Sequence, residues 1–280
     1  MNIYNHLIQQ LVQAHITVPR LEAKMLLAHL LDKDISDATI LEADLTPQQR
    51  EELEIFIRRR IQSHEPLDKI LGIKSFYKYD FMVNHNVLSP RPETEIIVEE
   101  ALKLLGKKNA RILDLGTGSG CILLSLLKEL PQSEGVGVDA SPEALTVAQK
   151  NAQKLDVENQ VKWVNCSWFD KDFSQKFSKV FDLIVTNPPY IPDAEIETLD
   201  PEVKNYDPRM ALSGGEDGYT SYRRIAEIVP LLLTDNGYIL LECGHGQAKT
   251  VADIFIKQNL SLYKIIKDLQ GIERCIILKK

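Results

Sequence analysis

The chain has 280 residues, 44% of them hydrophobic and 26% charged, which is the composition of a globular protein long enough for two domains. Its formal net charge of −7 argues against a protein whose main task is to hold a nucleic-acid backbone. No uninterrupted apolar run reaches membrane-spanning length, and the start of the chain lacks the basic and apolar segments of a signal peptide. We therefore expect a cytoplasmic protein that has no association with membranes.

The cysteines do not indicate a metal site. All four are scattered along apolar runs, without a C-x-x-C pair or companion histidines at zinc spacing (Cys121, Cys166, Cys243 and Cys275). We expect buried free thiols and no bound metal.

Residues 1–65 predict a small helical-bundle domain. Apolar residues keep helical spacing in 3–12 and 21–30, and the proline between these runs suits the first turn of the second helix. Thr46, Pro47 and Gln49 form a capping-box pattern that opens a third helix, continuing to Ile61. The three arginines at 58–60 fit a solvated C-terminal turn, or alternatively a docking patch.

Residues 66–88 predict a β-hairpin linker. The segments 70–72 and 76–83 are rich in apolar and aromatic residues and suit extended structure. A proline-stiffened segment, 89–95, then leads into a helix over 96–105 that Gly106 ends.

Residues 89–280 predict an α/β domain with a doubly wound, mostly parallel sheet, because strand-like runs alternate with helical segments after residue 108. The last two strands have no helix between them, which allows an antiparallel pair at the sheet edge. The expected strands are 110–115, 135–138, 161–164, 180–186, 238–241, 261–266 and 275–278.

A glycine-rich turn follows the first of these strands. It contains Gly116, Thr117, Gly118, Ser119 and Gly120, and its glycines let the backbone approach a ligand closely. In an open α/β sheet the crevice at the carboxyl ends of the strands is where ligands bind. The G-x-G-x-G spacing differs from the G-x-G-x-x-G of dinucleotide binders, so an oxidoreductase is disfavoured.

Two further residues follow strands that end at the same edge. Asp139 can accept hydrogen bonds from both ribose hydroxyls of an adenosine-containing ligand. Its alternative role is a helix N-cap, but Ser141 before Pro142 already fills that position. Trp168 follows the third strand, where it can pack beside an adenine or belong to the core.

Asn187-Pro188-Pro189-Tyr190 ends the strand over 180–186 abruptly, because neither proline can donate a hydrogen bond to a sheet. The tetrapeptide can be a turn that only closes a strand. It can also be a rigid corner that aims an amide side chain and two backbone carbonyls at one small planar group, with the tyrosine ring stacked beside it. This strand is expected beside 110–115, so the corner would lie across the crevice from the glycine-rich turn.

These motifs resemble a known family. The turn 114–120 resembles the S-adenosylmethionine loop of class I, Rossmann-like methyltransferases, and Asn-Pro-Pro-Tyr resembles the motif of enzymes that methylate planar amino or amide nitrogens. The flanks resemble the HemK-type release-factor glutamine methyltransferases, with only Lys69 and Ser89 departing slightly from the usual residues. The matching flanks are 66–67 with 71–72, 87–95, 207–212, 214–218, 241–247 and 268–274.

The resemblance implies S-adenosylmethionine as cofactor and the glutamine of the Gly-Gly-Gln motif of peptide chain release factors as substrate, methylated on N5 for translation termination. The helical domain would then hold the release factor away from the chemistry, and no stable nucleic-acid binding is expected. The cofactor-binding residues would be Gly116, Thr117, Gly118, Ser119, Gly120, Asp139, Trp168 and Asn187. The catalytic residues would be Asn187, Pro188 and Tyr190, and Pro189 would join these three in binding the substrate.

Two alternatives stay open. An adenine-N6 methyltransferase acting on DNA or RNA can use the same tetrapeptide, but it needs a basic channel for a flipped base. A non-catalytic nucleotide-binding module can share the glycine-rich turn. Arg91, Glu242 and His245 are expected near the crevice, either as support for the site or as structural anchors, and they have no assigned role.

Overall fold

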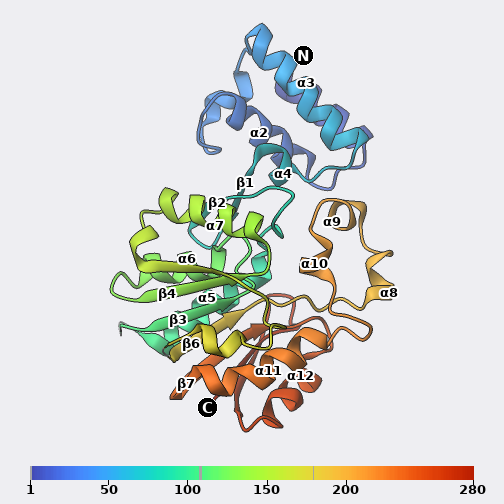
Figure 1. Ribbon diagram of the computed structural model, residues 1–280. Helices are drawn as coiled ribbons and strands as arrows, with labels where there is room; N and C mark the ends of the chain where they lie inside the picture. The colour runs from blue at the N-terminus through green and yellow to red at the C-terminus, as the bar shows by residue number, and fades with distance from the viewer. Residues whose placement is uncertain (1, 107–108, 179) are drawn as a thin grey trace. The chain divides into compact units, whose positions relative to one another are not determined.

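The computed structural model describes residues 2–106, 109–178 and 180–280, which form two compact units, Met1–Gly72 and Ile73–Lys280 (Figure 1). The sequence predicts one linker over 66–88, and the structure divides that range. In the structure the part up to Gly72 belongs to the helical unit, and the hairpin belongs to the sheet unit.

The first unit is the predicted helical bundle. The capping box is present: the side chain of Thr46 accepts from the backbone of Gln49, whose own side chain accepts from the backbone N–H of Thr46. One core of apolar residues, with Leu7, Leu26 and Ile40 at its centre, joins the helices. The elements are α1 (Ile3–Gln13), α2 (Pro19–Leu30), η1 (Ala38–Glu42), α3 (Pro47–Gln62) and α4 (Leu67–Leu71).

The arginines at the end of α3 are not a uniformly solvated turn. Arg60 is buried and makes a bidentate ion pair with the buried carboxylate of Glu22, at 2.7 and 3.0 Å. Arg59 pairs with Glu65. Arg58 is exposed and Arg59 is partly exposed, so Arg60 is the one of the three that is removed from solvent.

The hairpin is confirmed, but its expected first arm over 70–72 is wrong. Leu67 and Ile70 lie three residues apart and both face the core of the helical unit, so this apolar run is the helix α4, which ends at Gly72 in the left-handed conformation. The arms are β1 (Ile73–Phe76) and β2 (Tyr79–Met82), paired antiparallel.

The second unit is the predicted α/β domain, with a seven-stranded sheet in the order β5-β4-β3-β6-β7-β9-β8. The first five of these strands are parallel, and β9 runs antiparallel to both neighbours, which confirms the antiparallel pair at the edge. The strands are β3 (Arg111–Leu115), β4 (Glu134–Asp139), β5 (Val161–Asn165), β6 (Phe181–Thr186), β7 (Leu233–Glu242), β8 (Ser261–Lys267) and β9 (Glu273–Lys279).

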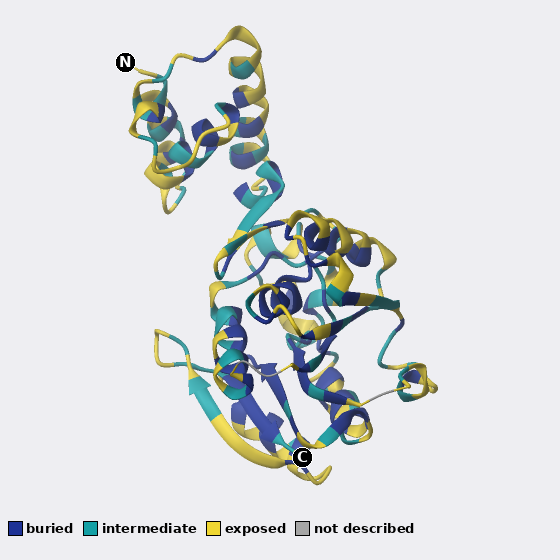
Figure 2. Ribbon diagram, turned by 90° about the vertical axis from the view of Figure 1, so that its left-hand side faces the viewer, coloured by how far each residue is buried: buried dark blue, intermediate teal, exposed yellow. Residues whose placement is uncertain are grey.

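Helices cover both faces of this sheet, as a doubly wound fold requires. Apolar residues of α5 and α6 pack with Ile112 and Leu183 on one face, and those of α11 and α12 pack with Leu113 and Ile184 on the other. Figure 2 shows the strands largely buried between exposed outer surfaces of the helices. The α-helices are α5 (Glu95–Leu105), α6 (Cys121–Glu129), α7 (Pro142–Lys154), α8 (Asp193–Ile196), α9 (Pro201–Lys204), α10 (Arg209–Leu212), α11 (Thr220–Leu232) and α12 (Ala248–Ile256), and the 3-10 helices are η2 (Pro92–Thr94), η3 (Glu158–Gln160) and η4 (Phe173–Lys176).

The strand order reverses at β3, which lies between β4 and β6. The chain proceeds from β3 to β4 and β5 on one side, and returns to β6 and β7 on the other. The register sets Leu115 beside both Val138 and Thr186, so these carboxyl ends are level. A ligand crevice is expected at such a switch point. No described helix is both long and apolar enough to cross a membrane.

Candidate active site

The glycine-rich turn joins β3 to α6 and is fixed to the neighbouring strand. The backbone N–H groups of Gly116 and Thr117 both donate to the carbonyl of Val138, at 2.9 Å each. Gly116 has φ +73°, and a Cβ there would lie 3.1 Å from the ring of Trp168. Gly118 has φ +54°, and a Cβ there would meet nothing within 4 Å. Glycine is favoured at this position by the left-handed backbone conformation, and it leaves the adjacent space free of a side chain.

Asp139 ends β4 and binds this turn. Its Oδ2 accepts from the N–H of Gly118, and its Oδ1 accepts from the N–H of Ser141, both at 2.9 Å. The N-cap of α7 is Ser141, whose hydroxyl accepts from Ala144, so Asp139 is free of that task. Each carboxylate oxygen has a second lone pair available to a hydroxyl donor. Burial raises the pKa of Asp139 above its ordinary value.

A second carboxyl group, Asp114, lies buried beneath the turn. The hydroxyl of Thr117 donates to its Oδ2 at 2.7 Å, and its Oδ1 has no hydrogen-bond partner among the described residues. Burial, together with the nearby charge of Asp139, raises the pKa of Asp114 to about 7.

Trp168 covers the first glycine of the turn and does not belong only to the core. Its backbone carbonyl accepts from Arg224 Nε at 2.7 Å, which fixes the loop after β5. Its Nε1 is buried and lacks a partner within the described part of the chain. The ring of Phe169 beside it is about half exposed.

The tetrapeptide forms a rigid corner after β6. Asn187 Nδ2 donates to the hydroxyl of Thr94 at 3.2 Å. Tyr190 donates its hydroxyl to Glu242 Oε1 at 3.3 Å, and its carbonyl accepts from Gln247 at 3.0 Å. Burial, and then the charge of Glu242, raises the pKa of Tyr190 far above its ordinary value, so the phenol remains protonated.

A cavity of about 380 Å³ lies at this edge of the sheet. Gly120, Pro188 and Tyr190 are not among its lining residues: Gly120 is the N-cap of α6, and Pro188 is buried. The predicted site residues that line the cavity are Gly116, Thr117, Gly118, Ser119, Asp139, Trp168, Asn187 and Pro189.

Two further segments, for which the sequence predicts no role, line the cavity. They are 86–91, before the sheet, and 208–213, around α10. Asp207 joins them, because its Oδ2 accepts from Arg91 at 2.8 Å and its Oδ1 accepts from the N–H of Ser89. Both segments contain motifs visible in the sequence, but only the fold shows that they converge. His245, by contrast, is exposed and does not line the cavity.

These groups fit an adenosine-containing ligand. The cavity presents a carboxylate with spare lone pairs, a glycine turn without side chains in the way, and an aromatic residue. Each suits one part of such a ligand: the ribose hydroxyls, the chain beyond the ribose, and a flat base.

Comparison with known proteins agrees with this architecture. Residues 2–72 match the PrmC N-terminal domain, and residues 106–244 match a methyltransferase domain family. The catalytic domain of hMettl16, solved with a MAT2A 3′UTR hairpin, shares the fold with a TM-score of 0.55 at 13% identity, over 83% of this chain and 81% of that one.

Relatives of known activity align over nearly the whole chain. The release factor glutamine methyltransferase of Rhodospirillum rubrum is 42% identical over 95% of this chain and 81% of its own length. That of Agrobacterium fabrum is 37% identical over 97% and 94%. With this identity across both units, the chain belongs to the release factor glutamine methyltransferases, which are S-adenosylmethionine-dependent enzymes.

Proposed function

We propose that this protein transfers a methyl group from S-adenosylmethionine to the side-chain nitrogen N5 of the glutamine in the Gly-Gly-Gln motif of peptide chain release factors. The observation that supports this most directly is the position of Asn187. Its side-chain amide lines the same cavity as the glycine-rich turn and Asp139. The activity named for the relatives supports the choice of acceptor.

The cofactor would be held by the residues at the ends of β3, β4 and β5. The turn from Gly116 to Gly120 would pass along it, Asp139 would accept from its ribose, and Trp168 would flank its base, with Asn187 closing the site. S-adenosylmethionine supplies a methyl group that its sulfonium already activates. The protein therefore has to position the acceptor and stabilise charge on it.

A glutamine amide is a weak nucleophile, because its nitrogen lone pair is delocalised into the carbonyl. The Asn187 side-chain oxygen and the Pro188 carbonyl would accept from the two N–H bonds of that nitrogen and orient its lone pair. Tyr190, together with Pro189, would flank the flat amide. Fixed dipoles at a developing charge are worth roughly 2.7–4 kcal/mol per group in oxyanion holes, and these acceptors would be a cationic counterpart.

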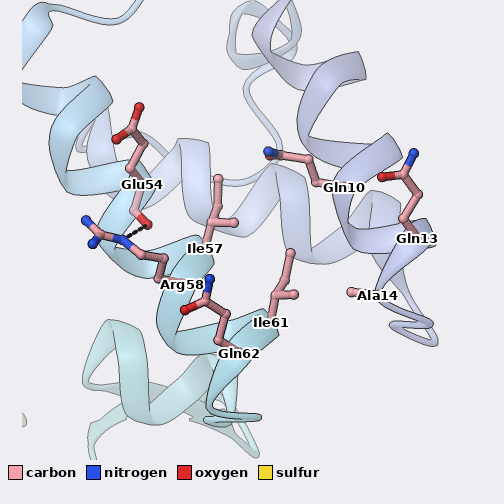
Figure 3. Close-up of a pocket in the computed structure, with 8 residues that line it drawn as sticks. All are labelled: Gln10, Gln13, Ala14, Glu54, Ile57, Arg58, Ile61 and Gln62. Atoms are coloured by element: carbon pink, nitrogen blue, oxygen red, sulfur yellow. Dashed lines mark hydrogen bonds between the residues drawn. The ribbon is translucent and has the colours of Figure 1, made fainter.

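The helical unit would bind the release factor outside the reaction centre. A groove of about 520 Å³ runs between α1 and α3, with Ile57 and Ile61 projecting toward α1 and glutamines on its walls (Figure 3). Arg58, the exposed member of the three arginines at 58–60, lies at its edge, where its Nε donates to the carbonyl of Glu54. Such a mixed apolar and amide surface suits a folded protein partner.

The decisive test is mass spectrometry of a release factor incubated with the protein and S-adenosylmethionine. We expect one added methyl group on the Gly-Gly-Gln peptide. Asn187→Ala should reduce single-turnover transfer by orders of magnitude and leave cofactor affinity, measured by calorimetry, largely unchanged. A variant rate within tenfold of wild type would remove Asn187 from the mechanism. Transfer to DNA or RNA in place of the release factor would favour the adenine-N6 alternative.

A further inference from the structure

A buried hydrogen-bonded chain lies behind the Asn187 amide. Thr94, in η2, receives the Nδ2 donor of Asn187 and gives its own hydroxyl proton to Glu242 Oε2 at 2.5 Å. Both Thr94 and Glu242 are buried, at 3% exposure each. Building on the proposed function, we propose that Thr94 and Glu242 are positioning residues that fix which end of the Asn187 amide faces the acceptor.

The direction of the hydrogen bonds carries this inference. A threonine hydroxyl has one proton, and in this chain Glu242 takes it. Thr94 can therefore only accept from Asn187, which places the NH₂ group against Thr94 and leaves the amide oxygen for the cavity. The proposed chemistry needs that oxygen there, because only an acceptor can hold an N–H of the substrate amide.

Protonation of Glu242 would reverse the chain. A neutral carboxyl group can donate to Thr94, whose proton is then free to go to the Asn187 oxygen. The amide would rotate and present its NH₂ group to another NH₂ group, the substrate nitrogen, so two donors would face each other. The charged form of Glu242 is thus the form that supports transfer.

The surroundings of Glu242 act on this charge in both directions. Burial raises the pKa of Glu242, and the hydrogen bonds from Thr94 and Tyr190 and the charge of Arg274 oppose that shift. Glu93 of η2 also raises the pKa of Glu242. The Cys121 thiol of α6, the Tyr222 hydroxyl of α11 and the Cys275 thiol of β9 lie close enough to feel its charge. Cys243 follows it in the chain.

The test measures single-turnover methylation of a release factor at saturating cofactor across pH. The wild-type rate should fall as pH decreases through the raised pKa of Glu242. Thr94→Val should be slower by roughly 10–100-fold, as for a misplaced reacting group, and should show a flattened pH profile. Thr94→Ser should restore rate and profile. Thr186→Val, which removes an equally buried hydroxyl donated to the Leu115 carbonyl, should keep the wild-type profile.

A double-mutant cycle separates positioning from general damage. If Thr94 acts through Asn187, adding Thr94→Val to Asn187→Ala should cost less than twofold more. If Thr94→Val does not fold, Thr94→Ala completes the same cycle. Independent losses that multiply, or a Thr94 variant with the wild-type pH profile, would overturn this inference alone. Absence of any transfer by the wild-type protein would overturn the proposed function, and this inference with it.

Discussion

Asp139→Asn tests the assignment of the ribose acid at almost constant shape. The carboxylate now accepts from two backbone N–H groups, those of Gly118 and Ser141, with one oxygen for each. A side-chain amide has only one oxygen, so its NH₂ group must face one of these two donors. The substitution therefore disturbs the turn and also removes one acceptor from the cavity.

The two effects are similar in size, but one appears in the free energy of folding and the other in the free energy of binding. Leaving one partly buried backbone N–H unsatisfied costs about 1–3 kcal/mol of folding free energy. Losing one charge-assisted hydrogen bond to a ligand hydroxyl costs about 1.5–3 kcal/mol of binding free energy, which is roughly a 10- to 150-fold rise in Kd. The protein should stay folded and bind the cofactor poorly.

Calorimetric titration with S-adenosylhomocysteine measures the binding term, and thermal unfolding measures the folding term. Glu143→Gln is the matched control, because Glu143 accepts from Ser141 at the start of the same helix but does not line the cavity. Since burial raises the pKa of Asp139 and its charged form is the acceptor, wild-type affinity should weaken as pH falls through that pKa. A variant Kd within threefold of wild type would show that this carboxylate does not contact the ligand.

Three further changes probe the turn and the groove. Because the pKa of Asp114 is raised to about 7, between about pH 4 and 7 this carboxyl group is protonated in the folded chain and ionised in the unfolded chain. The free energy of unfolding of the wild type should therefore fall by a few kcal/mol as pH rises through this window. Asp114→Asn should flatten that dependence in denaturant titrations. Gly116→Ala should weaken cofactor binding at least tenfold, measured by calorimetry, because the new Cβ sits at φ +73° and 3.1 Å from the ring of Trp168. Gly271→Ala, at φ +83° but with nothing within 4 Å, should leave cofactor binding unchanged. Ile57→Ser should raise the KM for a release factor but leave methylation of a free Gly-Gly-Gln peptide unchanged. Ile55→Ser, at an exposed position outside the groove, should change neither quantity.

Sequence periodicity predicted the layers of the sheet unit because its central strands are buried apolar runs and amphipathic helical segments alternate with them. The prediction failed at a short apolar run that is compatible with either a helix or a strand. Leu67 and Ile70 belong to such a run, and it is a helix because both side chains pack on the core of the helical unit. The prediction also missed the burial of Arg60, because its partner Glu22 lies 38 residues away.

The residues at the strand ends were visible from the sequence for a simple reason. Parallel strands end level, so Asp139 and Asn187 had to reach one edge with the turn that contains Gly116. Thr94 precedes the sheet, and the contact it makes with Glu242 depends on how η2 packs, which no local pattern encodes. In the structure, the pairing of Thr186 with Leu241 sets the next residues, Asn187 and Glu242, side by side, and this register could not be read from the sequence.

The fold and the tetrapeptide do not by themselves choose the acceptor, so we expect its selectivity to come from the cavity wall and from the helical unit proposed to bind the release factor. The fold also occurs in the hMettl16 catalytic domain, solved with an RNA hairpin, so it leaves the acceptor open. Asn-Pro-Pro-Tyr presents acceptors that suit any planar nitrogen. In the cavity wall, the ion pair of Arg91 and Asp207 joins the segments 86–91 and 208–213. A change that separates these segments should therefore have a larger effect on which acceptors enter the cavity than on the rate at which a bound amide is methylated.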